Sequence, residues 1–150
     1  MIGLVQRVCQ ARVEVAQPGC APLVVGEIGA GLLVFVCAEP ADTDEVARCF
    51  VDKVLKLRIF GDEAGKMNRS VVDVAGGLLI VSQFTLAADT RGGNRPSFAA
   101  AAPPDTGRRL YEKVLELARA RHQPVAAGRF GADMQVHLVN DGPVTIPLRL

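Results

Sequence analysis

The sequence predicts a single α/β domain of the α+β type, in which two helices cover a mixed, largely antiparallel, barrel-like sheet. Several short segments alternate apolar and polar residues, as half-buried strands do, and two longer segments have the apolar spacing of amphipathic helices. The chain of 150 residues is 49% hydrophobic, which suits one compact core. We see no internal repeat, so we treat residues 1–150 as one domain.

The first quarter of the chain is predicted to be β-structure. Four apolar or alternating segments are expected to be strands: Ile2–Val8, Arg12–Val15, Leu23–Glu27 and Leu32–Ala38. Cys9–Ala11 would join the first two, and the Pro- and Gly-containing residues 17–22 would form a turn or surface loop.

Two helix starts are recognisable from their capping residues. Residues 42–45 place acidic side chains at the positive end of a helix dipole, before an apolar stripe that includes Phe50 and Val54. Residues 103–106 open a second helix with Pro and Asp. His122 lies near its end, and we expect it to be a surface residue.

The stretch Leu78–Leu86 is the first candidate for function. It begins as a strand buried on both faces and then brings in the polar residues Ser82, Gln83 and Thr85. Buried polar groups cost free energy unless they are paired, so such residues usually have partners or a task. The alternative is a strand that leaves the core with its hydroxyls facing water.

The C-terminal stretch is the second candidate. Met134–Asn140 and Val144–Leu150 each alternate like a strand, and Asp141-Gly142-Pro143 interrupts them. Only the bond before proline adopts the cis form at low cost, and a preceding glycine removes the Cβ that would crowd a bend.

Composition excludes several functional classes. The net charge of +1 gives no overall field typical of nucleic-acid binding, so any RNA contact would depend on local arginines. We find no phosphate-binding loop, dinucleotide fingerprint or Gly-x-Ser-x-Gly elbow that would support a catalytic triad. The four cysteines are too widely spaced for zinc and are expected to be small core residues in a reducing compartment. We expect no cofactor, metal or membrane span, and a cytoplasmic protein.

Two motifs resemble those of a known family. Ser82-Gln83-Phe84-Thr85-Leu86 and Asn140-Asp141-Gly142-Pro143-Val144-Thr145 are similar to the two signature motifs of the D-aminoacyl-tRNA deacylases, which remove D-amino acids from tRNA. The resemblance continues over nearly the whole chain, in Met1-Ile2, Gln6-Arg7-Val8, Gly26–Gly29, Gly65–Asn68, Ala87–Thr90, Arg95–Phe98 and Gly128-Arg129-Phe130.

The resemblance implies a homodimer with active sites at the subunit interface. Gly142 and Pro143, joined by a cis bond, would enter the partner's pocket and act as the chirality filter. Their carbonyls would hold the amino group of a D-residue and clash with an L side chain. Achiral glycine would pass, so mischarged glycyl-tRNA is an expected second substrate.

The expected reaction is hydrolysis of the ester at the 3′-terminal adenosine of tRNA. The N–H groups around Phe84 and Thr85 are our candidates for stabilising the oxyanion, and Ser82 and Gln83 would order the pocket. Thr85 is the candidate nucleophile or water-positioning residue, although no base is visible beside it. The alternative, which we favour, is assistance by the ribose 2′-hydroxyl.

The remaining candidates would position substrate or the bend. Arg7 would fix the Gly-Pro bend, or be a surface charge, and Asn140 would pin the bend through its amide. Arg95, like Arg91, would contact phosphate or be a solvated charge. Phe130 and Met134 fit the core better than an adenine platform.

Two other functions remain open. A binding module could grip nucleic-acid ends without hydrolysis, and a general esterase would cleave simple D-amino acid esters that lack RNA.

Overall fold

The structure is a computed structural model that describes residues 1–17 and 19–150. Its elements in chain order are β1 (Ile2–Gln17), β2 (Cys20–Ile28), β3 (Gly31–Cys37), α1 (Asp44–Lys56), β4 (Phe60–Gly61), β5 (Met67–Arg69), β6 (Gly77–Ser82), the 3₁₀ helix η1 (Phe84–Ala87), α2 (Pro104–Arg119), β7 (Val125–Ala127) and β8 (Met134–Arg149). Within this part of the chain no helix is long and apolar enough to cross a membrane.

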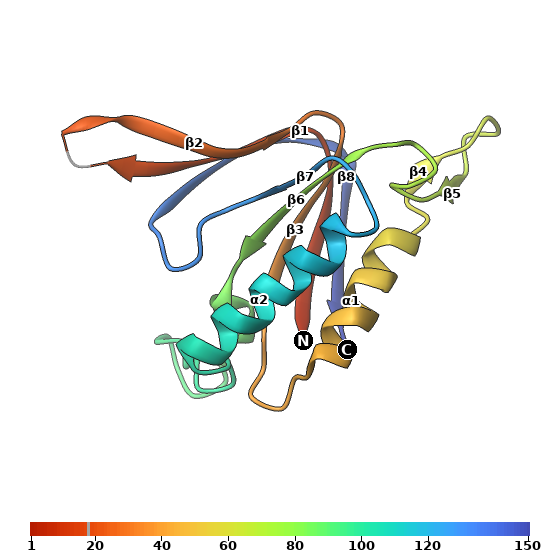
Figure 1. Ribbon diagram of the computed structural model, residues 1–150. Coiled ribbons are helices and arrows are strands. Elements are labelled where there is room, and N and C mark those ends of the chain that lie inside the picture. The colour runs from red at the N-terminus through yellow and green to blue at the C-terminus, as the bar shows by residue number, and fades with distance from the viewer. Residues whose placement is uncertain (18) are drawn as a thin grey trace.

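The main sheet has six strands in the order β2-β1-β3-β6-β7, and β8 pairs with β1 (Figure 1). The β3–β6 and β6–β7 pairs are parallel, and the others are antiparallel. The two ends of this order approach each other, because a Cβ on Gly26 of β2 would lie 2.5 Å from the carbonyl oxygen of Ala127 in β7. The sheet is therefore a nearly closed barrel, and the predicted fold class is confirmed.

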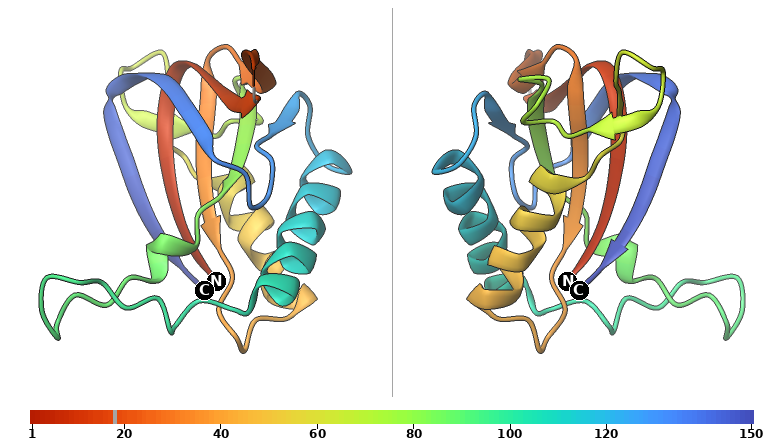
Figure 2. Two further views of the ribbon diagram at one scale, coloured as in Figure 1. Left: turned by 90° about the vertical axis from the view of Figure 1, so that its left-hand side faces the viewer. Right: turned by 90° about the vertical axis from the view of Figure 1, so that its right-hand side faces the viewer.

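Both helices pack on one side of the sheet (Figure 2). Their contact with the sheet forms one apolar core, which includes Phe50 of α1, Leu110 of α2 and Leu32 of β3. The barrel interior holds a second core, which includes Leu33 and Leu79. Successive residues of β3 thus serve opposite cores, which explains why this strand is apolar throughout.

Helix α1 begins as the sequence predicts, with the Thr43 hydroxyl accepting from the Val46 N–H. Helix α2 begins at Pro104, also as expected. We expected His122 to be a surface residue, but it is buried, with only 8% of it exposed. Its Nε2 lies 2.6 Å from the carbonyl oxygen of Gly76, so the residue ties the end of α2 to the start of β6.

The two predicted N-terminal strands are one continuous strand, β1. Its first half pairs with β3 and its second half with β2, while β8 runs along the opposite edge of both halves. The segment 9–11 is therefore where β1 changes neighbours, and Cys9 is exposed rather than in the core. The predicted loop is also shorter, because Gln17 pairs with Cys20; Pro18 lies outside the described residues.

Strand β8 is likewise continuous, but the predicted break is present as a bulge. Gln6 pairs with Thr145 and Val8 with Asn140, so the four residues 141–144 lie opposite Arg7 alone. Gly142 has φ +118°, and the Gly142–Pro143 bond is cis. We call residues 141–144 the bend.

Candidate active site

A largely apolar pocket of about 740 Å³ opens where β3 and β6 end. Val36 and Cys37 come from β3, and Val81 and Ser82 from β6, since the carboxyl ends of parallel strands meet at one edge. The start of α2 and the residues around Phe130 and Met134 complete the wall. Its volume falls in the range of roughly 300–1,000 Å³ typical of small-molecule sites.

We expected the polar stretch after Val81 to continue as a strand. Instead, β6 ends at Ser82. The Gln83 N–H still donates to the Val36 carbonyl at 2.8 Å, and the chain then turns into η1. The turn moves Thr85 away from the strand direction. Ser82, Gln83 and Phe84 line the pocket, whereas Thr85 is half-buried and is not one of the lining residues.

The start of η1 presents backbone N–H groups beside the pocket. The first N–H groups of a helix have no acceptor inside it, and Gln83 gives no side-chain cap. The Gln83 Nε2 instead donates to the Thr85 Oγ1 at 2.5 Å. Within the described chain, the N–H groups of Phe84 and Thr85 have no acceptor.

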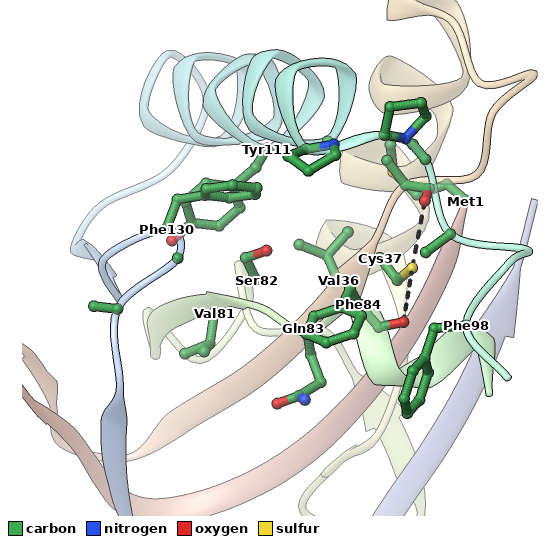
Figure 3. A pocket seen from close by; sticks show the side chains of 18 of the residues that line it. Met1, Val36, Cys37, Val81, Ser82, Gln83, Phe84, Phe98, Tyr111 and Phe130 are labelled. Carbon is green, nitrogen blue, oxygen red and sulfur yellow. Dashed lines mark hydrogen bonds between the residues drawn. The ribbon is translucent and has the colours of Figure 1, made fainter. Parts of the chain in front are cut away.

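Two aromatic pairs form opposite walls of the pocket (Figure 3). Phe84 and Phe98 meet edge to face, with ring centroids 5.2 Å apart, and Phe84 is 57% exposed. Tyr111 and Phe130 have centroids 5.9 Å apart. Phe130 and Met134, which we expected to be core residues, are half-buried and line the pocket.

Two site residues were missed from the sequence. Cys37 closes an apolar strand and points its thiol at the carbonyl oxygen of Phe84, 3.5 Å away (Figure 3). Burial, followed by the nearby Glu39 carboxylate, raises the pKa of this thiol. Tyr111 donates to the carbonyls of Ile80 at 2.9 Å and Gly128 at 3.2 Å, and burial raises its pKa to about 12. That Tyr111 is the chain's single tyrosine was the one available signal.

The bend lies at the opposite end of the sheet from this pocket. Arg7, opposite the bend, pairs with Leu32 of β3, whereas pocket residue Val36 lies four residues further along, roughly 13 Å at about 3.3 Å per residue. Figure 1 shows β8 turning at the end of the molecule remote from η1. Gly142 and Pro143 are both exposed there.

Arg7 holds the bend in place. Its Nε lies 2.9 Å from the carboxylate of Asp141, its Nη1 donates to the Ile59 carbonyl at 2.5 Å, and only 13% of its side chain is exposed. The surface-charge alternative for Arg7 is therefore excluded. Among the described residues the Asn140 side chain makes no hydrogen bond, so the expected amide pin is absent.

Arg95 lies on the exposed segment 90–100, which projects from the body after η1 (Figure 2). Neighbouring Arg91 is paired with Asp89, at 2.6 Å. Among the described residues, no group of three or more His, Cys, Asp or Glu side chains is placed to hold a metal ion.

Fold and pocket together define a nearly closed α+β barrel with an apolar pocket at the start of η1, where backbone N–H groups can stabilise an oxyanion, as in enzymes that transfer acyl groups or cleave esters. Residues 4–149 match the family model described as D-Tyr-tRNA(Tyr) deacylase. The chain therefore belongs to the D-aminoacyl-tRNA deacylase family, and the prediction of a hydrolase is confirmed.

Individual relatives agree with this assignment. A protein of Methylibium petroleiphilum named D-aminoacyl-tRNA deacylase is 68% identical over 99% of this chain and 94% of its own length. A protein of the same name from Paracidovorax citrulli is 66% identical over 100% of this chain and 94% of its own length. A solved structure titled c-Myc DNA Unwinding Element Binding Protein has a TM-score of 0.91 and 40% identity, covering 100% of this chain and 99% of the other. Another, titled as a probable eukaryotic D-amino acid tRNA deacylase, has a TM-score of 0.80 at 19% identity, covers 98% and 97%, and supports the fold alone.

Proposed function

We propose that this chain hydrolyses the ester between a D-amino acid and the 3′-terminal adenosine of tRNA, and that it accepts glycyl-tRNA as well. Family membership supports the reaction class. The observation that carries the proposal is the apolar pocket lined by Ser82, Gln83 and Phe84 at the start of η1, whose first N–H groups have no acceptor within the described chain.

The pocket offers the components that such a reaction needs. An aminoacyl ester is already reactive, so positioning, an oxyanion site and a placed water suffice. The N–H groups of Phe84 and Thr85 would stabilise the oxyanion that forms when water adds to the ester carbonyl. The ester C–O bond then breaks, and the ribose 3′-oxygen leaves with a proton. Phe130 and Met134 would pack against the adenosine.

Chirality would be judged across a dimer interface. The exposed bend cannot reach the pocket of its own chain, because β8 runs from the pocket at Met134 and Val136 to Gly142 six residues later, roughly 20 Å at about 3.3 Å per residue. A second copy could bring its Gly142 and Pro143 to this pocket. Their carbonyls would then accept from the amino group of a D-residue and block an L side chain.

Such a filter needs a bend of fixed shape. The contacts of Arg7 with Asp141 and Ile59 supply this support. Because the block is steric, it would work for many D-amino acids.

A second candidate is a nucleic-acid-binding module without hydrolysis. The solved structure that is 40% identical to this chain is called a DNA unwinding element binding protein, which supports this alternative.

Matched D- and L-aminoacyl-tRNA distinguish these functions when ester loss is followed for each. We expect cleavage of the D-substrate and of glycyl-tRNA, with the L-substrate at least about 100-fold slower if a clash costs about 3 kcal/mol. Equal cleavage of both enantiomers would remove the filter. Binding without cleavage would favour the module, and equal turnover of simple D-amino acid esters would favour a general esterase.

A further inference from the structure

Arg108 lies beside the pocket on the first turns of α2. It follows Gly107, which lines the pocket, and its side chain is exposed. Its guanidinium carbon lies 4.7 Å from the centroid of the Phe130 ring. The ring of Phe130 therefore contacts both Arg108 and Tyr111, and these two contacts fix its orientation at the rim.

In the described part of the chain, no carboxylate lies within ion-pair distance of Arg108. Seven of the thirteen arginines have an acidic partner within ion-pair distance, namely Arg7, Arg12, Arg48, Arg91, Arg109, Arg121 and Arg149. Within residues 1–17 and 19–150, the side chains of Arg108 and of Arg129, the residue before Phe130, make no ion pair or hydrogen bond; the Arg129 backbone N–H donates to Met134 Sδ at 3.4 Å. The rim next to Phe130 thus carries unpaired positive charge.

Stacking leaves the donors of a guanidinium free. Arg can rest on an aromatic face and still present its N–H fork to a planar or tetrahedral oxyanion. The rest of the pocket wall is mainly apolar and suits a nucleoside and an amino acid. The phosphate that joins the last nucleotide to the preceding one would have to remain outside this wall.

We propose that Arg108 is a substrate-binding residue that contacts this phosphate where the RNA strand leaves the pocket. The assignment rests on the proposed function, since it takes the terminal adenosine to occupy the pocket. A contact to phosphate carries no base information, so it would serve tRNAs of any sequence.

The test compares two substrates that differ in phosphate. One is D-aminoacyl-tRNA, and the other is 3′-O-(D-aminoacyl)adenosine, which has no phosphate. Arg108→Ala is expected to raise KM for the tRNA about three- to fivefold, the upper part of the range for one exposed charge contact. The kcat and the KM for the adenosine ester should stay within about twofold. The slope of log KM against log salt should fall by about 0.7, the value for one phosphate contact with a single strand.

Two further variants sharpen the comparison. Arg108→Lys keeps the charge and should recover part of the KM and of the salt slope. Arg109→Ala removes the same charge one position away, but Arg109 is already paired with Asp44, so KM should not change.

Equal losses on both substrates would overturn the proposal and leave Arg108 only as a support for Phe130. An unchanged KM for the tRNA would overturn it outright. Binding of uncharged tRNA and of adenosine, measured by fluorescence anisotropy, repeats the comparison without turnover. This binding measurement distinguishes failure of the proposed hydrolysis from failure of the proposed role of Arg108, because it does not depend on turnover.

Discussion

The hydrogen bonding of Thr85 argues against a role for this residue as the nucleophile. Its Oγ1 accepts a hydrogen bond from the Gln83 amide, and an amide nitrogen cannot remove a proton from a hydroxyl. Among the described residues the Thr85 hydroxyl has no His, Asp or Glu partner that could act as a base. We therefore expect Thr85 to shape η1 rather than attack the ester.

Thr85→Ala tests this expectation. Loss of a nucleophile typically lowers kcat by several orders of magnitude, whereas we expect loss of a structural hydroxyl to cost less than about tenfold, near 1.4 kcal/mol. A tRNA ending in 2′-deoxyadenosine should show the reverse pattern, with a large loss for the wild type. Full-rate cleavage of the deoxy substrate, together with an inactive Thr85→Ala, would contradict assistance by the 2′-hydroxyl.

Residues with a local sequence signal could be predicted, and residues defined by distant contacts could not. Ser82 and Gln83 could be predicted because polar residues follow a buried strand, and Phe84 because of the motif's resemblance to the family; all three line the pocket. Cys37 and Tyr111 were missed because their partners, Phe84, Ile80 and Gly128, come from other elements. His122 was misplaced for the same reason, since its partner Gly76 lies 46 positions earlier.

Helix α2 is attached to the sheet next to the pocket through the Tyr111 hydroxyl. Its two acceptors, on Ile80 of β6 and on Gly128 after β7, belong to neighbouring strands of the sheet. The neutral hydroxyl donates these bonds, so ionisation would break them.

The raised pKa of Tyr111 gives a prediction about alkaline stability. The folded-state pKa of about 12 lies above the ordinary value of 10.0, so the unfolded chain loses the proton first as the pH rises. The contribution of this group is complete below about pH 10 and is lost between about 10 and 12. Tyr111→Phe should be less stable than wild type at pH 7, and its free energy of unfolding should decline less steeply above pH 10. Urea unfolding from pH 7 to 11.5 measures both effects, and parallel declines would contradict the assignment.

For the helices and strands, the apolar pattern of the sequence predicted the type of each element better than the residues at which it begins and ends. Apolar periodicity located both helices and the central strands, because these features depend on neighbours along the chain. The sequence prediction divided β1 and β8 into two strands each. In the structure each is continuous, because β1 and β8 pair with each other on both sides of their irregular segments. The end of β6 was missed because the Gln83–Val36 bond and η1 are set by the parallel neighbour β3.

The whole molecule separates two parts that the proposed reaction needs together. The pocket lies at one end of the sheet, and the bend, held by Arg7, lies at the other. The sequence pointed to both motifs, but only the register of β1, β3 and β8 places them at opposite ends. An account in which both act on one ester therefore requires two copies of the chain.

Mixing two inactive variants tests this requirement most directly. Gly142→Ala damages the bend, because a Cβ there would lie 3.0 Å from both Arg7 Nη2 and Val144 Cγ2 at a φ of +118°. Ala102→Trp fills the pocket, which Ala102 lines. Each variant alone should be inactive, and circular dichroism should show that each is folded.

After joint refolding at equal amounts, statistical pairing makes half of the dimers mixed, and each mixed dimer has one intact pocket facing one intact bend. The account predicts recovery of about one quarter of the wild-type rate on D-aminoacyl-tRNA. If demonstrably mixed dimers stayed inactive, bend and pocket would not cooperate across subunits, and the central claim would be contradicted.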